Sequence, residues 1–196
     1  MRSVNYKLFA LSISLMVVLA ISATQAQAVS QTPDPELRNA LIKAVNSADS
    51  FKDRFDAEVW LLDMSARLAK KVPDNHARLD LLKHIHYEAS RAELPPEMVL
   101  AVIEVESNFN QWAISGVGAQ GLMQVMPFWL KEIGRDGDNL FSIKTNLRFG
   151  CTILKHYFDK EKGNWTRALA RYNGSLGRFK YPNKVLMKLR NNWFRR

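Results

Sequence analysis

The sequence contains a single cysteine, Cys151, so no disulfide bond can form within the chain. It has no apolar run of the roughly 20 residues that a membrane-spanning helix needs, and no convincing alternation of apolar and polar residues that would predict strands. It also lacks a phosphate-binding glycine loop and an H-E-x-x-H motif, and His84 and His86 are too close in sequence to share a helical face. We therefore expect no metal ion and no cofactor, and we interpret Cys151 as a small buried residue of the apolar run Asn146–Phe158.

Acidic residues are outnumbered by basic ones, which gives the chain a formal net charge of +9. Positive charge of this size favours polyanionic partners, either nucleic acid or the acidic peptide stems and anionic polymers of a cell wall. The basic residues gather near the C-terminus, where they could equally form a solvated face. They are Arg178, Lys180, Lys184, Lys188, Arg190, Arg195 and Arg196.

The first 28 residues have the pattern of a secretory signal peptide. Arg2 and Lys7 precede the apolar stretch Leu8–Ile21, and Ala26-Gln27-Ala28 is typical of a cleavage site. The apolar stretch is too short for a membrane anchor, and no cysteine follows it for lipid attachment. We expect cleavage before Val29, a net charge of +7 in the processed chain because only two cations are lost, periplasmic localisation and no integral membrane span after processing. The export signal favours the cell wall over nucleic acid as the partner.

Helical spacing of apolar residues, broken by Pro, Gly and Asn, predicts an all-α protein. Thr145 is the expected N-cap of one helix, and Pro127 suits the first turn of another. The loop Gly116–Gln124 has room for short β-bridges only. The predicted helices are Glu36–Ser47, Phe51–Lys71, His76–Ala92, Pro96–Glu106, Pro127–Ile133, Thr145–Asp159, Trp165–Tyr172 and Pro182–Asn192.

The most informative segment, ESNFNQWAISGVGAQGLMQVMP, runs from Glu106 to Pro127. Glu106 ends an otherwise apolar helix, where desolvation and the negative end of the helix dipole both raise the pKa of a carboxyl group. A partly protonated carboxylic acid near neutral pH is what general acid catalysis requires. From the residues alone, an exposed helix-terminal Glu is an equal alternative. Glu104 lies about 200° further round the helix axis, so we expect it to face solvent or an ion-pair partner.

This segment resembles the soluble lytic transglycosylases of bacterial cell-wall metabolism, whose catalytic domain is similar to goose-type lysozyme. The resemblance rests on Glu106-Ser107, on the ordered run Ala113–Pro127 and on Tyr172-Asn173, and it covers roughly Leu94 to Tyr181. It implies a lysozyme-like catalytic domain over 93–196, preceded by a helical segment over 29–92. The chain departs from the family's usual Y-N-A-G by having Tyr172-Asn173-Gly174-Ser175, and it has no Glu near Tyr181.

The resemblance implies that Glu106 is the single acid and base of a reaction that cleaves peptidoglycan glycan strands and leaves 1,6-anhydromuramoyl ends. It implies a substrate-orienting role for Ser115, which could otherwise be an ordinary turn serine. It also places a Tyr172 hydroxyl beside the acid, although Tyr172 could simply be the last buried residue of its helix. Expected substrate contacts are Ser115, Gln124, Met126, Tyr172 and Asn173, with Gln124 supplying both a donor and an acceptor.

Other roles for the same fold stay open at this stage. One is a peptidoglycan hydrolase of the lysozyme kind, and another is a non-catalytic peptidoglycan-binding assembly protein. Glycosidases normally use two carboxylates, and the motif supplies only Glu106, since Asp136 and Asp138 are explained as well by a turn. We expect peptidoglycan as the partner, no nucleic acid, and a possible association with cell-envelope machinery.

Overall fold

The computed structural model describes Pro35 and residues Arg54–Phe194. The chain divides into two compact units, 1–32 and 33–196, and the description below concerns the second. The predicted signal peptide and the predicted helix Glu36–Ser47 lie outside the described residues. Within the described ranges, no helix combines the length and apolarity needed to cross a bilayer.

The regular secondary structure of the described part consists of helices joined by loops. The helices are α2 (Arg54–Leu68), α3 (Asn75–Arg91), α4 (Pro96–Glu106), α5 (Phe128–Ile133), α6 (Ile143–Lys160), α7 (Trp165–Tyr172), α8 (Lys180–Lys188) and the π-helical turn η1 (Leu189–Trp193). Two isolated antiparallel bridges, Ile114 with Gln120 and Gln120 with Val125, occur in the long loop after α4, and no strand is present in these ranges. The all-α prediction is confirmed, as is the prediction of short bridges only.

Helix boundaries follow local chemistry. Pro96 begins α4, and the side chain of Asn164 accepts a hydrogen bond from Arg167 N at 3.1 Å to cap α7. The predicted cap of α6 was wrong. Ser142, not Thr145, is the N-cap, because the Ser142 hydroxyl accepts from Thr145 N at 3.4 Å and the helix therefore begins at Ile143.

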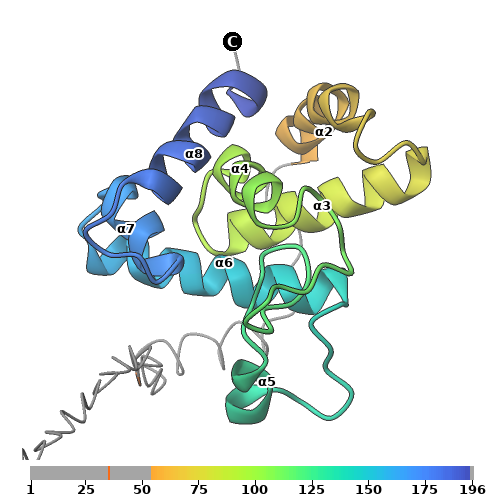
Figure 1. Cartoon of the computed structure of the whole chain (residues 1–196). Coiled ribbons are helices and arrows are strands. Elements are labelled where there is room, and N and C mark those ends of the chain that lie inside the picture. Colours follow the sequence, from red (N-terminus) through yellow and green to blue (C-terminus); the bar gives the residue numbers. More distant parts are fainter. Residues whose placement is uncertain (1–34, 36–53, 195–196) are drawn as a thin grey trace, which may run out of the picture. The chain divides into compact units, whose positions relative to one another are not determined.

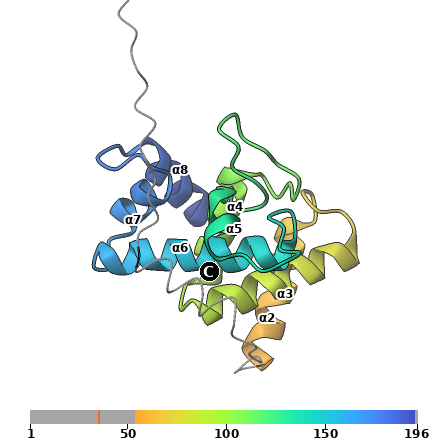
Figure 2. The same cartoon turned by 90° about the horizontal axis from the view of Figure 1, so that it is seen from below.

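The core is built around α4, which α3, α8 and η1 contact (Figure 1). Every residue from Met98 to Ile103 is buried, so this helix is covered on nearly all sides. Both views show α6 running along α3, with α7 at its C-terminal end (Figures 1 and 2). The apolar centre thereby fixes the C-terminal end of α4, where Glu106 lies.

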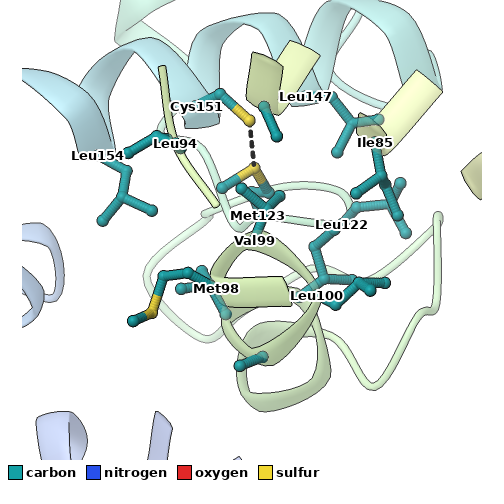
Figure 3. Packing of buried hydrophobic residues seen from close by; sticks show 14 of the residues in the cluster. Ile85, Leu94, Met98, Val99, Leu100, Leu122, Met123, Leu147, Cys151 and Leu154 are labelled. Atoms are coloured by element: carbon teal, nitrogen blue, oxygen red, sulfur yellow. Dashed lines mark hydrogen bonds between the residues drawn. The ribbon is translucent and has the colours of Figure 1, made fainter. Parts of the chain in front are cut away.

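One face of the core joins α4 and α6 through the loop that follows α4. Figure 3 shows Met98, Val99 and Leu100 of α4 below Met123 of this loop, with Cys151 of α6 above it. The Cys151 sulfur lies 3.9 Å from the Met123 sulfur and is fully buried, and burial raises the pKa of the thiol. Cys151 is thus the small, unreactive core residue that the sequence predicted.

Candidate active site

The carboxyl group of Glu106 lies at the C-terminal end of α4, half-buried, in contact range of α8. Tyr181 of α8 donates its hydroxyl hydrogen to Glu106 Oε1 at 2.5 Å. Burial raises the pKa of Glu106 to about 7, while the Tyr181 hydrogen bond and the positive charge of Lys184 oppose that rise. Glu106 therefore carries an ionisable proton near neutral pH, as a general acid and base requires.

Tyr172 lies near Glu106 but does not hydrogen-bond to it in the structure. The Tyr172 hydroxyl donates to the main-chain oxygen of Met123 at 2.8 Å, so its only hydrogen is used inside the fold. Burial, and then the charge of nearby Glu106, raise the pKa of the Tyr172 phenol. The tyrosine that bonds to the carboxyl group is Tyr181, which follows the loop after α7 and lies 75 positions after Glu106.

Glu104, two residues before the acid, has a different environment. It is buried and accepts hydrogen bonds from Lys188 at 2.9 Å and from Trp193 at 2.8 Å. The side-chain amide of Asn192 donates to both Glu104 carboxylate oxygens, at 2.9 and 3.0 Å. Burial alone would raise its pKa, but these bonds and the charge of Lys71 lower it overall. Of the two expected alternatives, the ion-paired one is correct and the solvent-facing one is not. Glu104 fastens α8 and η1 to α4 and is not a proton donor near neutral pH.

The chain leaves α4 through a strained turn. Asn108 and Phe109 both have positive φ angles, +50° and +67°, which are uncommon for residues other than glycine. The buried Phe109 ring packs on Trp193 with centroids 5.6 Å apart, and Lys71 donates a hydrogen bond to Asn108. These contacts hold the turn in its unusual conformation directly after the acid.

The two polar residues expected to contact substrate from the loop are both tied into it. Ser115 Oγ accepts from Ala119 N at 3.0 Å, which makes Ser115 a turn serine whose hydroxyl hydrogen remains available. The Gln124 amide nitrogen donates to the oxygens of Ala113 at 3.1 Å and Gly121 at 3.0 Å. Both amide hydrogens are thus used, so the expectation that Gln124 also donates to substrate was wrong, and its amide oxygen remains as an acceptor.

Asn146 of α6 holds this loop from beneath. Its side chain accepts from Met123 N and donates to the oxygens of Gln120 and Leu140, each at 2.8 Å. A Cβ atom on Gly121, whose φ is +75°, would lie 2.3 Å from both the Asn146 amide nitrogen and Leu140 O. Gly121 is therefore required for the loop to lie against Asn146.

The sequence model of the transglycosylase SLT domain matches residues 83–191, more than half of the chain and wider than the range first recognised. The chain belongs to the SLT transglycosylase family. The domain is 32% identical over 108 residues to a transglycosylase of Enterobacteria phage PRD1, covering 52% of this chain and 40% of that protein. It is 30% identical over 139 residues to the soluble lytic murein transglycosylase of Escherichia coli K12, covering 63% of this chain and 21% of the relative.

Among solved structures, the SLT domain is similar to an inactive mutant of the lytic transglycosylase Slt from Pseudomonas aeruginosa. The sequence identity is 31%, the TM-score is 0.43, and the match covers 56% of this chain and 18% of that one. The chain therefore spans less than half the length of the relatives described here.

The remaining expected contact residues lie in different environments. Met126 is half-buried and packs against the core, whereas Asn173 is exposed and ends α7 through its main-chain N–H. Sequence reasoning missed Tyr181 and Asn146 altogether. In the sequence, Tyr181 stands out only because no Glu lies near it, and nothing in the sequence marks Asn146 as a residue of the site. The signal available for Tyr181 was an aromatic residue one turn from Lys184 in a helix otherwise rich in cations.

Proposed function

We propose that this protein is a peptidoglycan lytic transglycosylase. It cleaves the β-1,4 bond between N-acetylmuramic acid and N-acetylglucosamine and leaves a 1,6-anhydromuramoyl end. The observation that carries the proposal is Glu106, an acid whose pKa burial raises to about 7 and which Tyr181 orients through a 2.5 Å hydrogen bond. Membership of the SLT family and the similarity to a soluble lytic murein transglycosylase support the same reaction class.

Glu106 serves first as acid and then as base. Its proton passes to the bridging oxygen as the bond from that oxygen to C1 of N-acetylmuramic acid breaks, which leaves an oxocarbenium-like centre. The 6-hydroxyl oxygen of the same sugar then bonds to C1, and its proton returns to the Glu106 carboxylate. A pKa near the working pH suits both steps, because the group must give and take a proton in one cycle.

The surroundings of Glu106 support a mechanism with one carboxylate. Among the described residues, the groups that shift the Glu106 pKa besides burial are Tyr181 and Lys184, neither of them acidic. Asp138, a rival from the sequence, accepts from Arg135 N at 2.9 Å and so serves its own turn. Hydrolysing glycosidases use a second carboxylate to activate water or to form a covalent intermediate, so trapping by the substrate's own hydroxyl fits this site better.

The proposed substrate contacts are groups that remain available in the loop after α4 and residues at the C-terminal end of α7. We assign to substrate binding the hydroxyl hydrogen of Ser115, the amide oxygen of Gln124, the half-buried Met126, the region of Tyr172 and the exposed Asn173. The predicted export through residues 1–28 and a periplasmic site of action belong to this proposal, since peptidoglycan lies outside the cytoplasmic membrane.

The product distinguishes this reaction from hydrolysis. We expect digestion of purified peptidoglycan to give muropeptides lighter by one water than the hydrolytic products, with no new reducing ends. The check is mass spectrometry after digestion in water enriched in heavy oxygen. Incorporation of heavy oxygen at reducing ends would show that the protein is a lysozyme-type hydrolase.

Tyr181→Phe is expected to slow the reaction roughly ten- to a hundredfold, since a hydrogen bond to a charged group contributes about 1.5–3 kcal/mol. The Tyr181 bond favours the carboxylate, so its loss raises the pKa of Glu106 above about 7. The alkaline limb of the pH–rate profile should therefore move to higher pH, by about one to two pH units.

Tyr172→Phe is the matched control for that measurement. It removes a hydroxyl that bonds to Met123 O, so we expect lower stability by about 1 kcal/mol and an unmoved alkaline limb. A limb that moves in Tyr172→Phe and stays fixed in Tyr181→Phe would reverse the assignment of the two tyrosines.

A further inference from the structure

The chain after Glu161 contains basic residues but no Asp or Glu. Some of these cations have partners inside the fold. Arg167 and Arg171 bond to Glu161, and Lys188 bonds to Glu104 at 2.9 Å. These residues are explained by the structure, whereas the cations around the start of α8 have no such role and lie nearest to the acid.

Lys180 and Lys184 are exposed, and no ion pair or side-chain hydrogen bond joins either of them to any residue of the described ranges. Four residues apart on α8, they lie about 40° apart around the helix axis and share one face. Arg178, also exposed and without such a partner among the described residues, precedes them in the loop after α7. We call Arg178, Lys180 and Lys184 the cationic strip.

The cationic strip borders the acid. Tyr181, which bonds to Glu106, lies about 60° from Lys184 around α8. The charge of Lys184 reaches Glu106, because it lowers the pKa of that carboxyl group. An anion held on the strip would therefore lie beside the bond that Glu106 protonates.

Stability does not explain why these cations are clustered, since only Lys184 acts on a carboxylate of the described residues. Like charges four residues apart on a helix repel each other and destabilise it slightly. Clustered cations without internal partners instead form a surface that attracts anions. The glycan backbone carries no charge of its own apart from its peptide stems, whose carboxyl groups are ionised above about pH 4.

We propose that the cationic strip binds the carboxylates of the peptide stems carried by N-acetylmuramic acid, so that the enzyme prefers stem-bearing glycan to bare glycan. This inference rests on the proposed function, whose substrate it narrows. The proposal is supported by the complementary charges of the cationic strip, which lies next to the acid, and of the stem carboxylates. The phosphate polymers attached to some cell walls are the alternative source of negative charge.

Binding tests the strip without catalysis. In a Glu106→Gln background, Lys180→Gln/Lys184→Gln should bind about three- to tenfold more weakly to insoluble peptidoglycan freed of phosphate polymers. Bare glycan for comparison is the same glycan after an amidase has removed the stems and the lactyl carboxylates that this exposes have been converted to neutral amides. Binding to it should change less than about twofold, and added salt should abolish the difference between variants. Cosedimentation measures binding to the insoluble wall, and isothermal titration calorimetry measures binding to the stripped strands, which become soluble once the cross-linking stems are gone.

Lys83→Gln/Lys131→Gln is the matched control, because it removes the same charge from exposed positions on α3 and α5. We expect it to leave both affinities unchanged. Equal weakening on stem-bearing and bare glycan, equal weakening by the control variant, or an effect seen only on walls that keep their phosphate polymers would each overturn the proposal.

Turnover provides the second arm, measured at about pH 5.5 where Glu106 is largely protonated whether or not Lys184 is present. The strip variant should raise KM about three- to tenfold on stem-bearing glycan with kcat nearly unchanged. A loss of kcat with constant KM would instead show that Lys184 acts on the protonation of Glu106, and it would overturn the proposal that the cationic strip binds stems. If wild type releases no product from either glycan, the proposed function fails. The binding measurements would still test whether the cationic strip binds stem carboxylates, because they need no catalysis.

Discussion

Glu106→Gln is expected to lose roughly 10²–10⁴-fold in turnover while keeping its fold, because general acid–base catalysis contributes that much and an amide cannot donate an acidic proton. The side chains have nearly the same shape, and Tyr181 can still donate to the amide oxygen at the position of Glu106 Oε1. The measurement is loss of turbidity of purified peptidoglycan, with circular dichroism as the control for folding. Turnover within about tenfold of wild type would show that the acid lies elsewhere.

The same substitution should change stability in a direction that depends on pH. The folded-state pKa of Glu106 is raised to about 7 from an ordinary value of 4.5. The folded protein therefore holds the proton more tightly, and wild type loses stability as pH rises from about 4.5 to about 7. At pH 8 we expect Glu106→Gln to be more stable than wild type by about 1–3 kcal/mol, with the difference gone near pH 4.

Glu104→Gln is the matched control for this pH dependence, since it lies two residues away on the same helix. The pKa of Glu104 is lowered, so its carboxylate stabilises the fold above the ordinary pKa and this contribution is lost as pH falls. Glu104→Gln should therefore be destabilised at neutral pH and less so in acid, the reverse of Glu106→Gln. Thermal unfolding of the three proteins between about pH 4 and pH 8 decides the signs.

Local chemistry explains why much of the fold was predictable. Pro96–Glu106 and Trp165–Tyr172 were predicted with the bounds that the structure shows, because a proline begins one helix and an Asn side chain caps the other. The start of α6 was misplaced by two residues, because Ser142 and Thr145 are both acceptable N-caps and only the geometry selects the serine. The raised pKa of Glu106 was predictable because the features that cause it, an apolar helix and an acid at its C-terminal end, are contiguous in the sequence.

The parts that were not predictable depend on contacts between distant segments. Tyr172 and Tyr181 both lie near the acid, and only the packing of α7 and α8 decides which hydroxyl reaches it. Glu104 reads as a surface residue until η1 covers it with Trp193 and Asn192. The role of Lys71 was hidden for the same reason, since it joins Glu104 and Asn108 from a segment that precedes the family match. The division of the chain at residues 92 and 93 stays a prediction.

Asn146→Ala is expected to destabilise the protein by about 3 kcal/mol or more, because it leaves two buried main-chain groups without partners and each costs about 1–3 kcal/mol. These groups are Met123 N and the oxygen of Leu140, each now 2.8 Å from the Asn146 side chain. The oxygen of Gln120 also loses a 2.8 Å bond but keeps the one from Val125 N at 3.0 Å. Activity should fall beyond what the folded fraction explains, since Gln124 and Ser115 belong to the same loop. The measurements are urea unfolding and turnover at a temperature where the variant is fully folded.

Two further substitutions separate the hydrogen bonds of Asn146 from general effects of losing an Asn. Asn146→Asp keeps the oxygen that accepts from Met123 N but places a carboxylate beside the oxygens of Gln120 and Leu140. Because the carboxylate repels these oxygens, we expect this variant to be at least as destabilised as Asn146→Ala above about pH 5. Asn183→Ala removes an exposed Asn from α8 and should change stability by less than about 0.5 kcal/mol. If Asn146→Ala were equally mild, the loop would be held by Gly121 and the packing of Met123 alone, and Asn146 would only fill space. The preference for Asn over its isostere Asp follows from geometry, because this one side chain accepts from Met123 N and donates to the oxygens of Gln120 and Leu140 at once.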